Sequence, residues 1–178
     1  QGLVGGIVIT ASHNPCTFNG FKVKAEYGGS ATPTITQDIE GRLGKTAVRT
    51  STTGIHLTAH SPEYSTRLRS LVDWKRIADS KLHIVVDSMH GSGGRLLEEM
   101  LAETSTRITT IRAEPDPLFG GISPEPMMPQ LEPLSEEVLR SGAAVGLATD
   151  GDADRLGVIS NEGRFVSTLE MLPLLLLH

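Results

Sequence analysis

Three aspartates, Asp150, Asp152 and Asp154, alternate with small residues in the segment DGDADR, which ends at Arg155. Carboxylates held this close repel one another, and the small residues between them allow the backbone to curl so that their oxygens converge. A hard divalent cation relieves such repulsion, and a site made only of oxygen ligands favours Mg²⁺ or Ca²⁺ over zinc. The segment therefore predicts a metal site.

Two other interpretations of this segment stay open. An EF-hand calcium loop carries Gly at its sixth position and Glu at its twelfth, where this chain has Arg155 and Asn161. A solvated acidic turn is the simpler alternative, but an apolar run at residues 144–148 leads into the segment and a cation follows it. A strand that delivers the loop favours a built metal site over a solvated turn.

A second segment that could do chemistry is TASHNP at residues 10–15, where Ser12 and His13 are neighbours. Ser, Asn and Pro all favour turns, so a plain polar turn remains an interpretation. A hydrolase nucleophile is disfavoured because the flanks lack the G-x-S-x-G elbow. Adjacent residues of an extended chain also point to opposite sides, which makes Ser12 and His13 a poor proton-relay pair. Ser12 fits better as a phosphoryl carrier, held by nearby cations and a metal.

Each of the two segments follows an apolar run that is typical of a β-strand. Residues 3–10 lead into the serine segment and are expected to form a buried strand, and residues 144–148 lead into the acidic segment. In open α/β sheets, ligands bind beyond the carboxyl ends of the strands. We therefore expect both segments at functional edges of sheets.

The rest of the chain alternates strand and helix patterns. Further strands are expected at residues 21–25, 82–86, 107–111, 155–160 and 164–166. Helices are expected at about residues 33–43, 61–72, 96–101 and 134–140, the second with an apolar face that includes Tyr64 and Leu71. These patterns predict an α/β fold with mixed sheets covered by helices, in a three-layer α/β/α arrangement that contains a βαβ unit.

Two connecting segments have unusual compositions. GSGG at residues 91–94 follows a strand but matches neither the dinucleotide-binding nor the Walker pattern, so we interpret it as a structural turn. Residues 115–133 hold six prolines, and a loop of this length suggests function or a domain contact. Within it, residues 119–121 and Glu125 are candidates for lining a cleft.

Composition narrows the class of protein. The formal net charge is −5 and the Lys and Arg residues are scattered, which argues against nucleic-acid and membrane partners. The longest apolar run, residues 172–177, is too short to span a bilayer. A single cysteine, Cys16, cannot form an internal disulfide, so we expect a reducing, cytoplasmic location.

Three motifs in order carry a resemblance to a known family. TASHNP at residues 10–15, NGFK at residues 19–22 and DGDADR at residues 150–155 together resemble the α-D-phosphohexomutase (phosphoglucomutase/phosphomannomutase) family. The resemblance covers the whole chain, with a mild departure at residues 16–18, where many relatives have a Tyr before the Asn-Gly. Members of this family have four α/β domains around a central cleft.

The resemblance implies one complete domain plus parts of two neighbours. Residues 1–57 would be the C-terminal part of domain 1 with the phosphoserine loop, residues 58–166 domain 2 with the metal-binding loop, and residues 167–178 the beginning of domain 3. A stretch rich in Thr, Ser and Gly at residues 44–60 supports the first boundary. The chain starts without Met and stops within a row of leucines, so we expect sequence missing on both sides, including most of domain 3 and all of domain 4.

The resemblance also implies residue roles. One Mg²⁺ per active site would be held by a phosphoserine oxygen and three carboxylates: Ser12, Asp150, Asp152 and Asp154. Lys22 and Arg155 would hold the transferring phosphate, and His13 would aid proton transfer. Phosphoserine carries about −1.5 to −2 charges, which the cations would offset.

The implied reaction interconverts hexose 1-phosphate and hexose 6-phosphate through a phosphoserine enzyme and a hexose 1,6-bisphosphate, which also serves as activator. Glucose or mannose phosphate is preferred, because relatives acting on glucosamine phosphate more often have Gly in place of Ala153. The alternative is a non-catalytic sugar-phosphate or metal-binding module derived from this family. We expect the chain by itself to be inactive, because the family's sugar and phosphate sites lie in domains 3 and 4.

Overall fold

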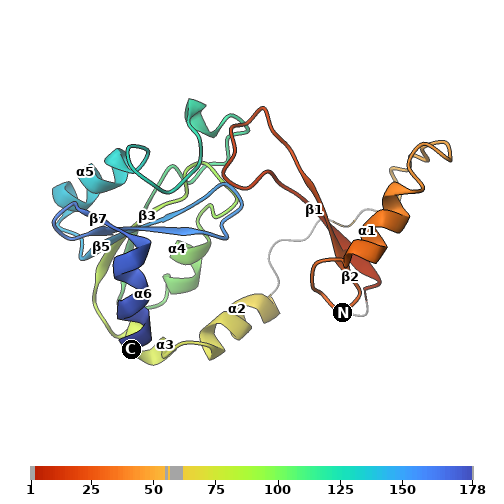
Figure 1. Cartoon of the computed structure of the whole chain (residues 1–178). Helices are drawn as coiled ribbons and strands as arrows, with labels where there is room; N and C mark the ends of the chain where they lie inside the picture. Colours follow the sequence, from red (N-terminus) through yellow and green to blue (C-terminus); the bar gives the residue numbers. More distant parts are fainter. Residues whose placement is uncertain (1–2, 55, 57–61, 178) are drawn as a thin grey trace. The chain divides into compact units, whose positions relative to one another are not determined.

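The computed structural model of the chain describes residues 3–54, 56 and 62–177. The chain forms two compact units, coloured along the sequence in Figure 1. The first unit contains Gln1–Thr10 and Asn19–Tyr64, and the second contains Ala11–Phe18 and Ser65–His178. The predicted domain boundary at residues 57 and 58 lies outside the described residues, and the predicted domain limits stay predictions.

The first unit is a two-stranded antiparallel sheet with one helix. Strand β1 (Gly5–Ile9) pairs with β2 (Phe21–Ala25), and Ile7 lies opposite Val23. Helix α1 (Pro33–Glu40) begins after Thr32 with Pro at its first position, where the fixed φ of proline suits a helix start. These three elements lie where the sequence patterns predict them.

The expectation that the first strand is buried is wrong. Every residue of β1 is exposed, with Ile7 at 62% and Ile9 at 59% of their full accessibility. The reason is that β1 pairs only with β2 in a two-stranded sheet, and α1, the helix of this unit, contributes no buried residue to a core. An apolar strand is buried only where another element packs on it.

The second unit is built on a five-stranded mixed sheet with the order β4-β3-β5-β6-β7. Strand β3 runs parallel to β4 and β5, whereas β5, β6 and β7 are antiparallel neighbours. The bounds of the strands are β3 His83–Asp87, β4 Arg107–Ile111, β5 Val145–Thr149, β6 Leu156–Ser160 and β7 Phe165–Val166. The predicted strands of this part of the chain are confirmed to within one residue.

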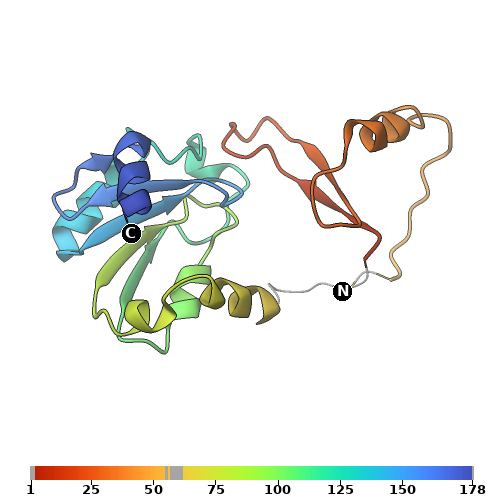
Figure 2. The ribbon, with the colours of Figure 1, turned by 60° about the horizontal axis from the view of Figure 1, so that its bottom comes forward.

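Helices cover both faces of this sheet. Helix α5 (Glu132–Ser141) packs against β3, β5 and β6, and helix α4 (Leu96–Leu101) packs against β4 from the other side (Figures 1 and 2). The fold is therefore α/β in three layers, as predicted, and β3-α4-β4 is the expected βαβ unit. The core that joins α5 to the sheet consists of Val85, Met89, Leu131, Leu134, Val138, Ala143, Ala148 and Ile159.

Other helices lie outside this core, namely α2 (Pro62–Ser70), α3 (Trp74–Ala78) and α6 (Thr168–Leu177). The apolar face predicted for residues 61–72 is not buried, and Ser61 lies outside the described residues. Helix α2 is instead held by Arg69, which stacks 4.6 Å from the Trp74 ring centroid and donates a 3.0 Å hydrogen bond to the Met100 carbonyl. No helix in the described part of the chain has the length and apolarity needed to cross a membrane.

The proline-rich loop is fixed to the sheet by a buried ion pair. Asp87, fully buried at the carboxyl end of β3, accepts a 2.8 Å hydrogen bond from Arg112 Nε and a second bond from Arg112 Nη2. The same guanidinium donates at 2.9 Å to the carbonyl oxygen of Gln130 in the loop. Strands β3 and β5 are parallel, so their carboxyl ends lie at the same edge of the sheet. The Asp87–Arg112 pair therefore holds the proline-rich loop at the edge where Asp150 follows β5.

Candidate active site

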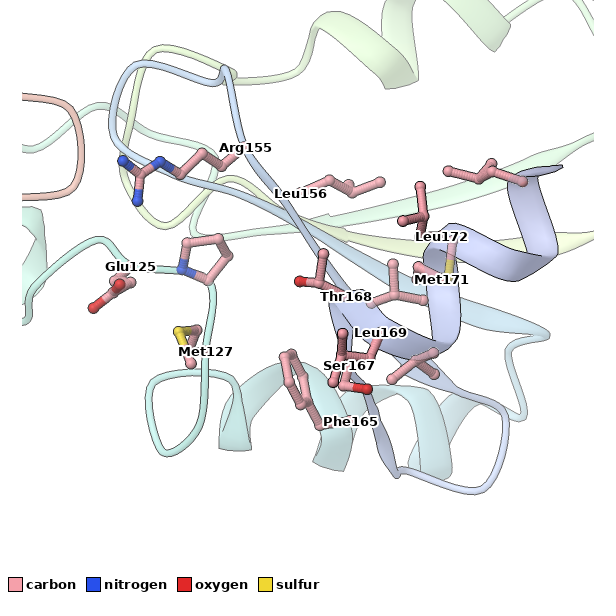
Figure 3. A pocket seen from close by; sticks show the side chains of 14 residues that line it. Glu125, Met127, Arg155, Leu156, Phe165, Ser167, Thr168, Leu169, Met171 and Leu172 are labelled. Atoms are coloured by element: carbon pink, nitrogen blue, oxygen red, sulfur yellow. The ribbon is translucent and has the colours of Figure 1, made fainter.

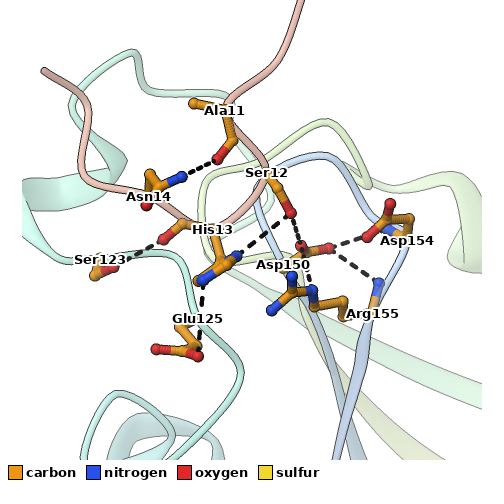
Figure 4. A network of polar contacts seen from close by, with 9 residues as sticks. All are labelled: Ala11, Ser12, His13, Asn14, Ser123, Glu125, Asp150, Asp154 and Arg155. Carbon is orange, nitrogen blue, oxygen red and sulfur yellow. Dashed lines mark hydrogen bonds and ion pairs between the residues drawn. The ribbon is translucent and has the colours of Figure 1, made fainter. Parts of the chain in front are cut away.

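The serine segment folds as part of the second unit. Residues 11–18 form a turn in which the Asn14 backbone N–H donates at 3.1 Å and its side-chain amide donates at 2.9 Å to the Ala11 carbonyl. Ser12 has a φ of 56°, in the left-handed region. A non-glycine residue held there costs about 1–3 kcal/mol, and such strain concentrates at functional sites. Figure 4 shows this turn beside the acidic loop.

The acidic loop begins directly after β5. Asp150 is fully buried, and its Oδ1 accepts hydrogen bonds from the backbone N–H groups of Asp154 (3.0 Å) and Arg155 (3.1 Å). The Asp150 carboxylate therefore stabilises the curled backbone of the acidic loop. One ligand oxygen from each of Asp150, Asp152 and Asp154 lies within 4.8 Å of the other two, as a shared cation would require.

The serine and the acidic loop are in direct contact. Ser12 Oγ donates a 3.1 Å hydrogen bond to Asp150 Oδ2 (Figure 4). The two backbones also approach closely at Gly151, where a Cβ would lie only 2.6 Å from the Ser12 carbonyl oxygen. A side chain at this position would push the loops apart. The glycine of the motif thus permits the contact that joins the candidate phosphoryl carrier to the candidate metal ligands.

His13 lies closer to Ser12 than an extended backbone would allow. His13 Nδ1 is 3.5 Å from Ser12 Oγ, so the expectation that neighbouring side chains point to opposite sides is wrong here. The cause is the left-handed φ of Ser12, which turns the following residue back toward the serine oxygen. This arrangement places a ring nitrogen of His13 next to the serine oxygen, and the role of His13 in proton transfer stays a prediction.

The charges of the site are unbalanced within this loop. Three carboxylates face one guanidinium, a formal sum of −2, and Arg155 Nε lies 3.8 Å from Asp150 Oδ2. Arg155 is 49% exposed, so its remaining donors can reach an incoming anion. The donor set consists only of hard oxygens and one of them is fully buried, which fits Mg²⁺ or Ca²⁺.

Comparison with known proteins identifies the family. Residues 62–163 match the model described as "Phosphoglucomutase/phosphomannomutase, alpha/beta/alpha domain II", and residues 1–50 match the corresponding model of domain I. The first match alone spans more than half of the chain. The chain belongs to the phosphoglucomutase/phosphomannomutase family. The family resemblance carried by the three motifs is thereby confirmed.

Curated relatives carry a narrower name than the family. The chain is 33% identical to a "Probable phosphoglucosamine mutase" of Methanothermobacter thermautotrophicus, with 98% of this chain and 39% of the relative covered. It is 33% identical to the "Phosphoglucosamine mutase" of Levilactobacillus brevis, with 93% and 37% covered. The chain thus spans about two fifths of the length of the curated relatives it matches.

Solved structures agree on the fold. A putative phosphomannomutase from Thermus thermophilus superposes with a TM-score of 0.87 at 32% identity, covering 99% of this chain and 41% of that one. The pp63/parafusin of Paramecium superposes with a TM-score of 0.69 at 20% identity, covering 92% and 36%, and supports the fold alone. The α/β fold of this family member is therefore shared with solved phosphohexomutase chains.

The proline-rich loop adds residues that the sequence analysis only partly anticipates. Glu125 Oε1 lies 4.0 Å from His13 Nε2, and Ser123 Oγ donates a 2.8 Å hydrogen bond to the His13 carbonyl (Figure 4). Glu125 is among the residues predicted to line a cleft, whereas Ser123 is not. The length and proline content of the loop are the available signal, but they do not identify which hydroxyl reaches a neighbour.

A groove of about 640 Å³ adjoins this site. Glu125 and Arg155 line one end, and apolar side chains from β6, β7 and α6, including Leu156, Phe165 and Leu172, line the rest (Figure 3). Glu125, which lies near His13, and Arg155, which lies near Asp150, therefore border both the candidate site and the groove. The remaining predicted site residue, Lys22, lies on β2 in the first unit, paired with Val8, and its role as a phosphate-holding cation stays a prediction.

Proposed function

We propose that this chain is the serine- and metal-bearing part of a phosphosugar mutase that interconverts hexose 1-phosphate and hexose 6-phosphate. The observation that carries the proposal is the 3.1 Å contact between Ser12 Oγ and Asp150, the buried member of three converging carboxylates. A serine that accepts a phosphoryl group at this place can share an oxygen with the cation that the carboxylates bind. The family to which the chain belongs performs this class of reaction.

In this proposal one Mg²⁺ is held by a Ser12 phosphate oxygen and by Asp150, Asp152 and Asp154. When bound, the ion supplies charge stabilisation for the transferring phosphoryl group, which is worth several kcal/mol in metal-dependent enzymes. Arg155 and Lys22 hold the phosphate oxygens. Phosphoryl transfer leaves the protein mainly the tasks of positioning and charge stabilisation.

The reaction consists of two mirrored transfers. A hydroxyl of the bound hexose phosphate forms a bond to phosphorus while the bond from phosphorus to Ser12 Oγ breaks, and the hydroxyl proton passes to the serine oxygen. The product is hexose 1,6-bisphosphate. After the bisphosphate turns around, Ser12 Oγ forms a bond to its other phosphorus while the bond from that phosphorus to the sugar oxygen breaks. The serine proton passes by way of His13 Nδ1, 3.5 Å from Ser12 Oγ, to the departing sugar oxygen. The original phosphoserine is thereby restored.

The sugar is proposed only as a hexose. Ala153 favours glucose or mannose phosphate, and a solved relative is called a putative phosphomannomutase, but the curated relatives are called phosphoglucosamine mutases. Comparing kcat/KM for glucose, mannose and glucosamine 1-phosphates on the full-length protein decides among them. The single cysteine, Cys16, favours a reducing compartment such as the cytoplasm.

The decisive test is Ser12→Ala in the full-length protein. The variant should lose both phosphorylation at this site, read by intact mass, and conversion of hexose 1-phosphate. Cys16→Ser, an exposed change in the same turn, is the matched control and should behave as wild type. Asp152→Ala should lower turnover by about a hundredfold or more. Full-rate conversion by the Ser12→Ala protein would eliminate the carrier role.

The non-catalytic alternative makes the opposite prediction. A sugar-phosphate or metal-binding module would bind its ligand without exchanging phosphate with Ser12.

The 178-residue chain alone is also expected to show no mutase turnover, even with Mg²⁺ and hexose 1,6-bisphosphate, because transfer depends on holding the substrate in line. Robust turnover by this chain would contradict the expectation that the cleft is shared with further domains.

A further inference from the structure

The turn at residues 91–94 lies directly against the acidic loop. The backbone N–H of Ser92 donates a 3.0 Å hydrogen bond to the carbonyl oxygen of Gly151. The turn itself is closed by the Gly91 N–H, which donates at 2.7 Å to the Ser88 carbonyl at the end of β3. The segment that the sequence analysis interprets as a structural turn therefore supports the loop that carries the candidate metal ligands.

Gly91 leaves no room between the two backbones. A Cβ at this buried position would lie 2.7 Å from the Gly151 carbonyl oxygen, 2.9 Å from the Gly151 Cα and 3.0 Å from the Asp150 carbonyl oxygen. All three neighbours are backbone atoms of the acidic loop, so they cannot move aside by changing a rotamer. Any side chain at residue 91 has to displace the loop.

Gly93 makes an equally close approach one residue before the acidic loop. A Cβ at Gly93 would lie 2.7 Å from Thr149 Oγ1, at the last residue of β5. Gly93 thus approaches Thr149, and Gly91 approaches the next two residues, Asp150 and Gly151. The turn therefore contacts both the last residue of β5 and the start of the acidic loop.

Gly151 contacts both the turn at residues 91–94 and the serine segment. Its backbone contacts the turn, as described above, while a Cβ on it would meet the Ser12 carbonyl oxygen at 2.6 Å. A displacement of Gly151 by the turn would therefore change the separation of Ser12 from Asp150, which is 3.1 Å between Oγ and Oδ2.

We propose that the turn formed by Gly91, Ser92 and Gly93 is a positioning element of the active site. It holds the acidic loop at the place where its three carboxylates converge and where Ser12 reaches Asp150. The turn contacts the reacting groups only through the loop. The inference rests on the proposed function, because the position of the acidic loop matters only if its carboxylates bind a metal and Ser12 carries a phosphoryl group.

The first test measures binding of Mn²⁺, as a spectroscopic probe for a hard divalent cation, to the 178-residue chain by electron paramagnetic resonance. Gly91→Ala should weaken Mn²⁺ binding by about 10- to 100-fold, the usual effect of disturbing residues that orient metal ligands. Gly6→Ala in β1 is the matched control, because a Cβ there meets Lys24 Cβ at an ordinary 3.6 Å. Its Mn²⁺ affinity should equal that of wild type.

A general loss of stability has to be separated from a shift of the loop. Ile159→Val in the buried core should lower the urea midpoint while leaving Mn²⁺ affinity unchanged. In the full-length protein, Gly91→Ala should lower kcat and leave the KM for hexose phosphate near its wild-type value. A purely structural role of the turn would instead make Mn²⁺ affinity follow the urea midpoint.

A double-mutant cycle keeps the inference testable if Gly91→Ala fails to fold. Gly93→Ala should weaken Mn²⁺ binding, Thr149→Ala should change it little, and the double variant should recover most of the affinity because the 2.7 Å clash is gone. Additive effects in this cycle, in folded variants, would overturn the inference. If instead Asp152→Ala leaves Mn²⁺ binding intact, the metal site of the proposed function fails, whatever the glycine variants do.

Discussion

The two units show what an apolar strand needs before it becomes part of a core. Strands β1 and β3 each contain three consecutive β-branched apolar residues, yet β1 is exposed along its whole length and β3 is buried from Ile84 to Asp87. Strand β3 has a strand on each side and helices on both faces of its sheet, whereas β1 has one neighbouring strand. The difference teaches that burial comes from the layers around a strand and not from its own residues.

The same contrast governs the candidate site. The serine turn follows β1 in the sequence, but residues 11–18 belong to the second unit, where the core and the acidic loop lie. Chemistry that depends on a few tenths of an ångström requires a rigid support, and the second unit supplies one through the buried Asp87–Arg112 pair and close glycine contacts. The following predictions test this contrast, beginning with the largest expected effect.

The buried ion pair of the second unit should matter far more than an exposed pair of the first. Arg112→Ala leaves Asp87 buried without its cation, and breaking a buried pair in this way costs about 3–5 kcal/mol. Arg42→Ala removes the exposed i,i+4 pair with Asp38 and should not measurably change the unfolding midpoint. Urea unfolding followed by circular dichroism compares the two, and equal midpoint shifts would refute the contrast.

Truncation of an apolar side chain should destabilise the second unit more than the first. Leu134→Ala removes a fully buried side chain between α5 and the sheet, and such changes cost about 2–5 kcal/mol. Ile7→Ala on β1 should cost much less, because that side chain is already 62% exposed. The same urea experiment measures both. A larger effect from Ile7 than from Leu134 would show that β1 is covered in solution.

Amide hydrogen exchange should rank the two sheets without any substitution. Amides of β3, such as that of Val85, are expected to exchange only through global opening, whereas amides of β1, such as that of Val8, should exchange through local opening. Exchange at neutral pH, read by NMR, gives the opening free energy at each site. Equal protection in β1 and β3 would mean that the units share one cooperative transition.

The smallest expected effect lies within the proline-rich loop. Hydrogen bonds from the backbone N–H groups of Leu118 and Gly120 hold the pKa of the Asp116 carboxyl below its ordinary value. Because the folded pKa is depressed, the carboxylate stabilises this turn above the pKa of the unfolded chain, and the effect is lost as the pH falls through the folded value. Exchange of the Leu118 and Gly120 amides should be faster in Asp116→Asn at pH 7.

The pH dependence supplies the control for this last prediction. The difference in exchange between wild type and Asp116→Asn should shrink as the pH falls below the ordinary aspartate range, since the wild-type carboxyl then becomes neutral as well. A difference that persists at low pH would show that the carboxylate charge is not what orders the turn.

Much of the molecule follows from local patterns in the sequence. The strands of the second unit, the βαβ unit and the start of α1 all lie at the predicted residues, because hydrophobic periodicity and helix-start signals act over a few neighbours. The chemical nature of the site also follows locally. Three alternating carboxylates and a serine in a polar turn indicate oxygen ligation and phosphate chemistry wherever they lie in the fold.

The tertiary structure decided the rest, for reasons that no short segment contains. Ser12 meets Asp150 across 138 positions of sequence, and His13 reaches the serine oxygen only because Ser12 is held at a left-handed φ. The burial of β3, the exposure of β1 and the support of the acidic loop by Gly91 each depend on which backbones pack together. Such packing is the sum of many weak contacts between distant residues, and the residue types at one position do not reveal it.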